Sequence, residues 1–213
     1  MRQILNDADR TLLEKHIRDA EIRTGVQIVF AVTKRSDCYT ELPWKAFAFG
    51  VSITGLAVFF LLLHPSFWIT KTTILLSVSS ILVTGTALAL LTLLFPGFAR
   101  LFLSGNRKET EPLQYAESLF LSHELFASEG RRGFLMLISK FERQIVILPD
   151  AGVKTLLSAD AMKNIISGMK IHLRRNELRS AMETGLEKLV EALLPPATEV
   201  PDKNELPELI IDE

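Results

Sequence analysis

Two sets of polar residues have the types and spacing for chemistry. Asp37 follows an apolar run and stands between Ser36 and Tyr39. Asp150 follows another apolar run, and three charged residues precede that part of the chain: Glu129, Arg131 and Arg132. Arginines beside an aspartate can bind a phosphate group, whereas calcium needs several oxygen ligands without adjacent cations. The two arginines therefore argue against a calcium site at Asp150.

Both aspartates also have a structural interpretation. An aspartate after a strand commonly caps a turn, and an Asp–Arg pair on a loop is commonly a modest salt bridge. The sequence has no Ser-His-Asp spacing, P-loop, Gly-rich phosphate loop or HExxH motif, and a lone Cys38 excludes a multi-cysteine metal site. No catalytic residue is recognisable, so the sequence leaves open whether the protein is an enzyme.

The central part of the 213-residue chain predicts a transmembrane hairpin over residues 44–96. Between Ala46 and Ala99 the only charged residue is Lys71. Each of the segments 44–63 and 73–95 has about the 20 apolar residues that a helix needs to cross a bilayer. The alternative, two buried core helices, would require more protein than about 160 remaining residues supply.

Basic residues near the two spans predict their orientation. Lysines and arginines concentrate on the cytoplasmic side of a membrane, and the flanks outnumber the turn six to one. The flanking set is Lys34, Arg35, Lys45, Arg100, Arg107 and Lys108. We therefore expect a two-span protein of a bacterial inner membrane with both termini cytoplasmic. The same six residues are candidate ligands for anionic lipid headgroups, or serve as topology determinants alone. A net charge of -1 without a basic run predicts no nucleic-acid partner.

The flanking regions read as one discontinuous α/β domain, residues 1–43 and 100–194. The pattern predicts a helix at 7–24, a buried strand at 26–33, and a crossover helix at 112–129 that begins at Pro112. Further elements are predicted as follows: strands at 133–140 and 143–149 joined by two residues, helices at 158–172 and 176–193, and a disordered acidic, proline-rich tail at 195–213. The fold class is thus a small mixed sheet flanked by helices and interrupted by the membrane hairpin.

This topology sorts the polar residues into two ends of the sheet. Ser36, Asp37 and Tyr39 follow the first strand, and Lys140 and Glu142 follow the second, so all five should lie at the membrane-proximal end. Arg131, Arg132 and Asp150 should lie at the opposite end. Parallel α/β sheets bind ligands beyond the carboxyl ends of their strands, which favours the proximal end.

The whole pattern resembles the TPM-domain family, sometimes labelled TPM phosphatase. The resemblance lies in "NDADRTLLEKHIRDAEIRTGVQIVFAV", in "YAESLFLSHELFASEGRRGFLMLISKFERQIVILPDAGV" and in a "NELP" segment near the C-terminus. It implies an α/β sandwich, often attached to a membrane. Some relatives are associated with acid phosphatase activity or calcium binding, which makes calcium the implied ion. Many relatives have Asp or Asn where this chain has Arg131 and Arg132, so an inherited metal site is disfavoured.

We expect the protein to be a membrane-tethered module that interacts with, or maintains, a membrane complex. Its partners would be the bilayer and another membrane protein, bound at the proximal strand ends or at the acidic tail. The alternative is a phosphate-ester hydrolase, implied by the family label.

Overall fold

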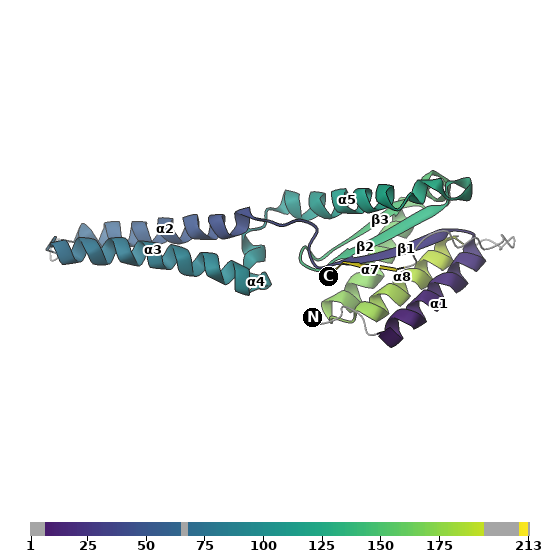
Figure 1. Ribbon diagram of the computed structural model, residues 1–213, viewed down its shortest axis with the longest axis horizontal. Coiled ribbons are helices and arrows are strands. Elements are labelled where there is room, and N and C mark those ends of the chain that lie inside the picture. Colours follow the sequence, from purple (N-terminus) through teal and green to yellow (C-terminus); the bar gives the residue numbers. More distant parts are fainter. Residues whose placement is uncertain (1–6, 65–67, 194–208, 213) are drawn as a thin grey trace. The chain divides into compact units, whose positions relative to one another are not determined.

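The computed structural model describes residues 7–64, 68–193 and 209–212, and divides the chain into two compact units. One unit combines residues 1–36 and 109–213 and is called the sheet unit here; residues 37–108 form the hairpin unit. The mixed α/β class that the sequence predicts is confirmed (Figure 1). The hairpin unit contains the ion pairs of Arg107 with Asp37 and Glu41.

The sheet has the strand order β3-β2-β1-β4. β1 (Gln27–Thr33) pairs in parallel with β2 (Gly133–Ser139), and β2 pairs antiparallel with β3 (Gln144–Pro149). These three strands and their directions agree with the sequence prediction. The predicted two-residue connection between β2 and β3 was wrong: four residues, 140–143, form the turn, and Arg143 takes a left-handed φ of 55°.

A fourth strand, β4 (Leu209–Asp212), pairs in parallel with β1. The prediction of a disordered tail is wrong for these four residues, while 195–208 and 213 lie outside the described residues. The pairing makes β1 an internal strand. This position agrees with the continuous apolar run in its sequence, because a strand covered on both faces and both edges has no solvated side.

Helices cover both faces of the sheet. α1 (Asp7–Thr24), α7 (Ala159–Arg174) and α8 (Leu178–Leu193) pack on one face, and α5 (Gly105–Ser122) covers the other (Figure 1). Side chains of a strand alternate between faces, so the two cores draw on alternate residues of β1. Ile28 and Phe30 belong to the core beneath α1, whereas Val29 and Ala31 belong to the core beneath α5.

The crossover helix differs from the prediction in both of its limits. α5 begins at Gly105, so Pro112 lies inside the helix and not at its start. A proline costs one helical hydrogen bond, and here its ring is buried, which offsets part of that cost. The helix ends at Ser122 because Glu124 takes a left-handed φ of 52°. Two short 3-10 turns, η2 (Leu125–Ala127) and η3 (Glu129–Arg131), lead on to β2.

In the hairpin unit, α2 (Glu41–Leu62) and α3 (Lys71–Leu94) are long and apolar enough to cross a membrane. They are followed by α4 (Pro96–Ala99) and the 3-10 turn η1 (Arg100–Phe102). The two long helices meet at glycines: a Cβ on Gly50 would lie 3.0 Å from the Cα of Gly85. Gly55, by contrast, has open space around it.

Candidate functional site

The carboxyl ends of β1 and β2 bring together Ser36, Ser139 and Glu142 in the sheet unit. Ser139 ends β2, Glu142 lies in the following turn, and Ser36 lies three residues beyond β1. The backbone N–H of Ser36 donates to Glu142 Oε1 at 2.9 Å. The Ser139 hydroxyl donates to Glu142 Oε2. The Ser36 hydroxyl donates in turn to Ser139 Oγ at 3.0 Å. Parallel pairing of the two strands produces this meeting, as the sequence predicted for Ser36 and Glu142.

Burial makes this cluster chemically distinctive. Glu142 is fully buried and Ser139 is 1 % exposed, whereas Ser36 is half-buried. A carboxylate removed from water needs hydrogen-bond donors, and the serines supply them. The same contacts form a chain from the Ser36 hydroxyl through Ser139 to a buried carboxylate. Such a chain can fix the orientation of the Ser36 hydroxyl and relay its proton inward.

Three cations adjoin this cluster. Lys140 N donates to the carbonyl of Thr33, and Phe141 N donates to the carbonyl of Lys34, both at 3.0 Å. The guanidinium of Arg35 lies 4.8 Å from the centre of the Phe141 ring. Burial, and then the nearby positive charge of Lys34, lower the pKa of Lys140 below its ordinary value. The strand ends therefore hold a positive surface above a buried negative group.

The other predicted headgroup ligands lie in the hairpin unit, and two of them contact acids. Arg107 donates to Asp37 at 2.5 Å and to Glu41, and Lys45 lies 3.8 Å from Glu41. Asp37 also accepts from the backbone N–H of Cys38 at 2.7 Å, as a turn-capping residue does. Arg100 begins η1, and Lys108 lies in the first turn of α5. Asp37 is thus occupied as an ion-pair and capping residue.

At the amino end of β2, Arg131 and Asp150 form a bidentate ion pair. Arg131 Nε lies 3.0 Å from Asp150 Oδ2, and Nη2 lies 2.8 Å from Oδ1. Asp150 also caps the short helix α6 (Ala151–Lys154), accepting from Ala151 N at 2.7 Å. The hydrogen bond from Arg131 lowers the pKa of Asp150 below its ordinary value.

The two remaining candidates of that end, Glu129 and Arg132, are exposed in the preceding loop. Their part in ligand binding stays a prediction. Within residues 7–64, 68–193 and 209–212, no three His, Cys, Asp or Glu side chains converge on a point where they could hold a metal ion.

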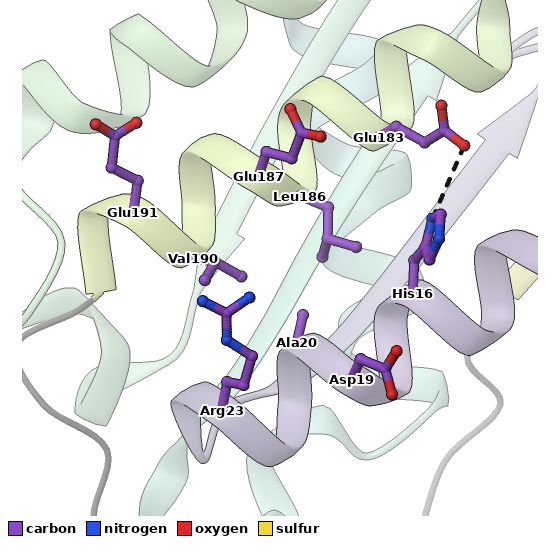
Figure 2. A pocket seen from close by; sticks show the side chains of 9 residues that line it. All are labelled: His16, Asp19, Ala20, Arg23, Glu183, Leu186, Glu187, Val190 and Glu191. Atoms are coloured by element: carbon purple, nitrogen blue, oxygen red, sulfur yellow. Dashed lines mark ion pairs between the residues drawn. The ribbon is translucent and has the colours of Figure 1, made fainter.

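A groove of about 540 Å³ runs between α1 and α8 on the outer side of the sheet unit. Figure 2 shows Glu183, Glu187 and Glu191 along α8, with Glu183 directed toward His16, and Asp19 and Arg23 on α1. Glu183 is engaged by Arg179 at 2.9 Å and lies 3.8 Å from His16. Three acids of the groove are exposed and form no ion pair in the described part of the chain: Asp19, Glu187 and Glu191.

Sequence reasoning missed Ser139 and the groove. Ser139 is the last residue of a strand whose other members are apolar or glycine, and a buried hydroxyl at that place is the signal that could have indicated it. The groove had a fainter signal, the four-residue spacing of three glutamates on α8, which places them on one side of a helix.

Residues 101–192 match the TPM domain. That stretch includes all of α5, β2, β3, α6 and α7 and all but the last residue of α8, but not α1, β1 or the hairpin helices. The fold is similar to the NMR structure of the BA42 protein from the psychrophilic bacterium Bizionia argentinensis, with a TM-score of 0.57. The alignment covers 100% of this chain and 98% of that chain at 12% identity, which shows a shared fold alone. None of the curated proteins matches the sequence.

Proposed function

We propose that the protein is a membrane-tethered interaction module with a TPM-like domain on the cytoplasmic side of a bacterial inner membrane. The apolar surface of α2 and α3 carries this proposal. Only 11% and 6% of their most apolar 18-residue windows are buried, so large apolar side chains cover the outside of both helices. In water such a surface would be costly at about 25 cal/mol per Å², whereas a bilayer covers it.

Two further observations favour a binding role over catalysis. Asp37 and Asp150, the acids that a metal or phosphoryl reaction would use, are held in ion pairs with Arg107 and Arg131. The groove between α1 and α8 instead offers unpaired acids beside apolar side chains such as Leu186 and Val190. The acidic lining residues outnumber the one arginine, Arg23, so the net charge of the groove complements a basic segment that also carries apolar residues.

The position of the module indicates where such a segment comes from. Cytoplasmic loops of inner-membrane proteins are rich in lysine and arginine near their spans. A cytoplasmic domain tethered to the same membrane meets these loops at high local concentration. We therefore propose that the α1–α8 groove binds the basic juxtamembrane segment of another membrane protein, and that the tether makes this weak contact effective.

The tether is tested with single cysteines. Cys38 is the natural cysteine, and a Cys38→Ser, Thr70→Cys chain carries one cysteine between the two spans. A membrane-impermeant maleimide applied to intact spheroplasts should label position 70 at once and Cys38 only after permeabilisation. Labelling of Cys38 in intact spheroplasts, or protection of position 70, would refute the orientation. Extraction of the protein by alkaline carbonate would refute insertion itself.

The partner is tested by photo-crosslinking. A crosslinking amino acid at Asp19, in the groove, should form an adduct with a membrane protein, and mass spectrometry should place the linked peptide in a Lys/Arg-rich loop. The variant Glu187→Lys, Glu191→Lys should abolish the adduct, while Asp160→Lys on α7 should preserve it. An adduct that maps to an acidic peptide, or that persists after charge reversal, would exclude this use of the groove.

A phosphate-ester hydrolase is the second candidate, and the Ser36–Ser139–Glu142 chain is the observation in its favour. The detergent-purified chain would be assayed with p-nitrophenyl phosphate, with and without calcium or magnesium. Turnover that Ser36→Ala removes and Ser167→Ala retains would establish catalysis and displace the non-catalytic proposal. Ser167 is an exposed serine of α7, which makes it the matched control.

A further inference from the structure

Three cations of the sheet unit are held together at the carboxyl ends of β1 and β2. Lys34 and Arg35 follow β1, and Lys140 follows β2. The backbone bonds from Lys140 N to Thr33 O and from Phe141 N to Lys34 O, both 3.0 Å, fix these two segments side by side. Arg35 stacks over Phe141, which lies in the turn between β2 and β3.

The hydrogen bonds of Glu142 hold the segments that carry these cations close to each other. Glu142 accepts from the backbone N–H of Ser36 and from the hydroxyl of Ser139, so one side chain connects the segment after β1 to the end of β2. Separation of Lys34 from Lys140 would break these bonds and expose donors whose partner is a carboxylate. The fold thus keeps the positive charges of Lys34 and Lys140 close together in spite of their electrostatic repulsion.

Among the side chains that the structure describes, no acid forms an ion pair with these cations. Lys34 and Arg35 are exposed, Lys140 is half-buried, and none of the three forms an ion pair within the part of the chain that the structure describes. The lowered pKa of Lys140 is one consequence, with burial as its larger cause and the charge of Lys34 as its second. By contrast, Arg107 and Lys45 of the hairpin unit have Asp37 or Glu41 beside them.

We infer that Lys34, Arg35 and Lys140 form a binding site for the phosphate group of an anionic phospholipid. Two ammonium groups and a guanidinium fork are donors suited to a phosphate oxyanion. The lipid as source rests on the proposed membrane tether. Arg35 precedes the first residue of α2 by six residues, a length that spans at most about 21 Å, so α2 cannot enter the bilayer without bringing this edge close to the headgroups.

The test uses the full chain in an uncharged maltoside detergent. Native mass spectrometry measures the fraction that carries one phosphatidylglycerol or one phosphatidylcholine molecule at equal lipid concentrations. Wild type should bind phosphatidylglycerol at least tenfold more tightly than phosphatidylcholine. Each cation near a lipid surface contributes about 1 kcal/mol, which is about fivefold, so Lys34→Gln, Lys140→Gln should weaken phosphatidylglycerol binding about 25-fold. Arg35→Gln, an exposed change, should weaken it about fivefold.

The matched control is Lys163→Gln, Lys170→Gln, which removes the same net charge from exposed positions on α7 and should leave binding within twofold. Equal losses in both double variants, or no preference for phosphatidylglycerol in wild type, would overturn the inference. Inorganic phosphate and glycerol phosphate form the second arm. If either competes with phosphatidylglycerol at equal concentration, the site takes a soluble phosphate and the lipid assignment is overturned.

Failure of the tether has a separate signature. The same wild-type protein is mixed with neutral phosphatidylcholine during nanodisc assembly, where insertion needs the hairpin and no anionic lipid. Lack of co-assembly would refute the membrane hairpin. Co-assembly without a phosphatidylglycerol preference would refute the phosphate site alone.

Discussion

Replacement of Glu142 by alanine should destabilise the sheet unit strongly. The substitution removes the acceptor of two hydrogen bonds, from Ser36 N and from the Ser139 hydroxyl. Glu142 and Ser139 are buried, whereas Ser36 is half-buried. A hydrogen bond to a charged group contributes about 1.5 to 3 kcal/mol, and a donor left unpaired in the interior costs about as much. The expected loss is therefore about 3 to 5 kcal/mol in the free energy of unfolding.

The change is measured by far-UV circular dichroism of the full chain in detergent, where the sheet unit melts while detergent supports the apolar hairpin. At about 2 to 4 °C per kcal/mol, Glu142→Ala should lower the melting temperature by about 6 to 20 °C. Glu142→Gln retains one acceptor oxygen and should lose about half as much. A double-mutant cycle with Ser139→Ala should give a coupling free energy above about 1 kcal/mol, because the two side chains share one bond.

The control is Glu187→Ala, an exposed glutamate without an ion pair in the described structure, which should change stability by no more than about 0.5 kcal/mol. If Glu142→Ala melts within 2 °C of wild type, the carboxylate does not hold the strand ends together. The reasoning would also fail if Glu142→Ala and Glu187→Ala shifted the melting temperature equally, or if the Ser139 cycle were additive.

Three further predictions concern other parts of the chain. Arg131 lowers the pKa of Asp150 below its ordinary value of 3.8, so their ion pair stabilises the folded state above about pH 4 and this stabilisation is lost as the pH falls through the folded pKa. The urea midpoints of wild type and Asp150→Asn should therefore differ at pH 7 and converge in acid. Gly50→Val should cost about 1 to 3 kcal/mol through overpacking of the two long helices, measured by detergent melting, whereas Gly55→Val, with open space around it, should be neutral. Lys34→Gln should raise the pKa of Lys140 and lower its reactivity toward acetylating reagents near pH 9, measured by peptide mass spectrometry; an unchanged rate would mean that the two charges do not interact.

Local patterns made most of the sheet unit predictable from sequence. Continuous apolar runs marked β1 and β2, and Gly25, with its φ of 63°, ends α1 where expected. The crossover helix was misplaced because Pro112 reads as a start signal, and the burial that lets the helix tolerate a proline is a tertiary effect. β4 was not predicted for a similar reason: four residues of a proline-rich tail form a strand only because they pair with the edge of β1.

The candidate sites show a sharper limit, because the sequence predicts charges but not their pairing. Strand direction alone brought Ser36 and Glu142 to one end and Arg131 and Asp150 to the other. Whether an acid remains available for chemistry depends on its partners, and Asp150 is engaged by Arg131 and by the capping of α6. The partners of an acid depend on side-chain geometry, which cannot be predicted from the spacing of residues in the sequence.

Pairing also changes how the basic residues around the hairpin should be interpreted. A topology rule counts six cations equally, and a lipid-binding hypothesis built on that count would give Arg107 the same role as Lys34. Arg107 contacts two acids, so its transfer to a headgroup would first have to break those pairs and leave both carboxylates unpaired. Lys34 has no such cost, since an arriving phosphate relieves its repulsion with Lys140. Among these cations, neutralisation of Lys34 should therefore weaken anionic lipid binding more than neutralisation of Arg107, although both count equally toward orientation.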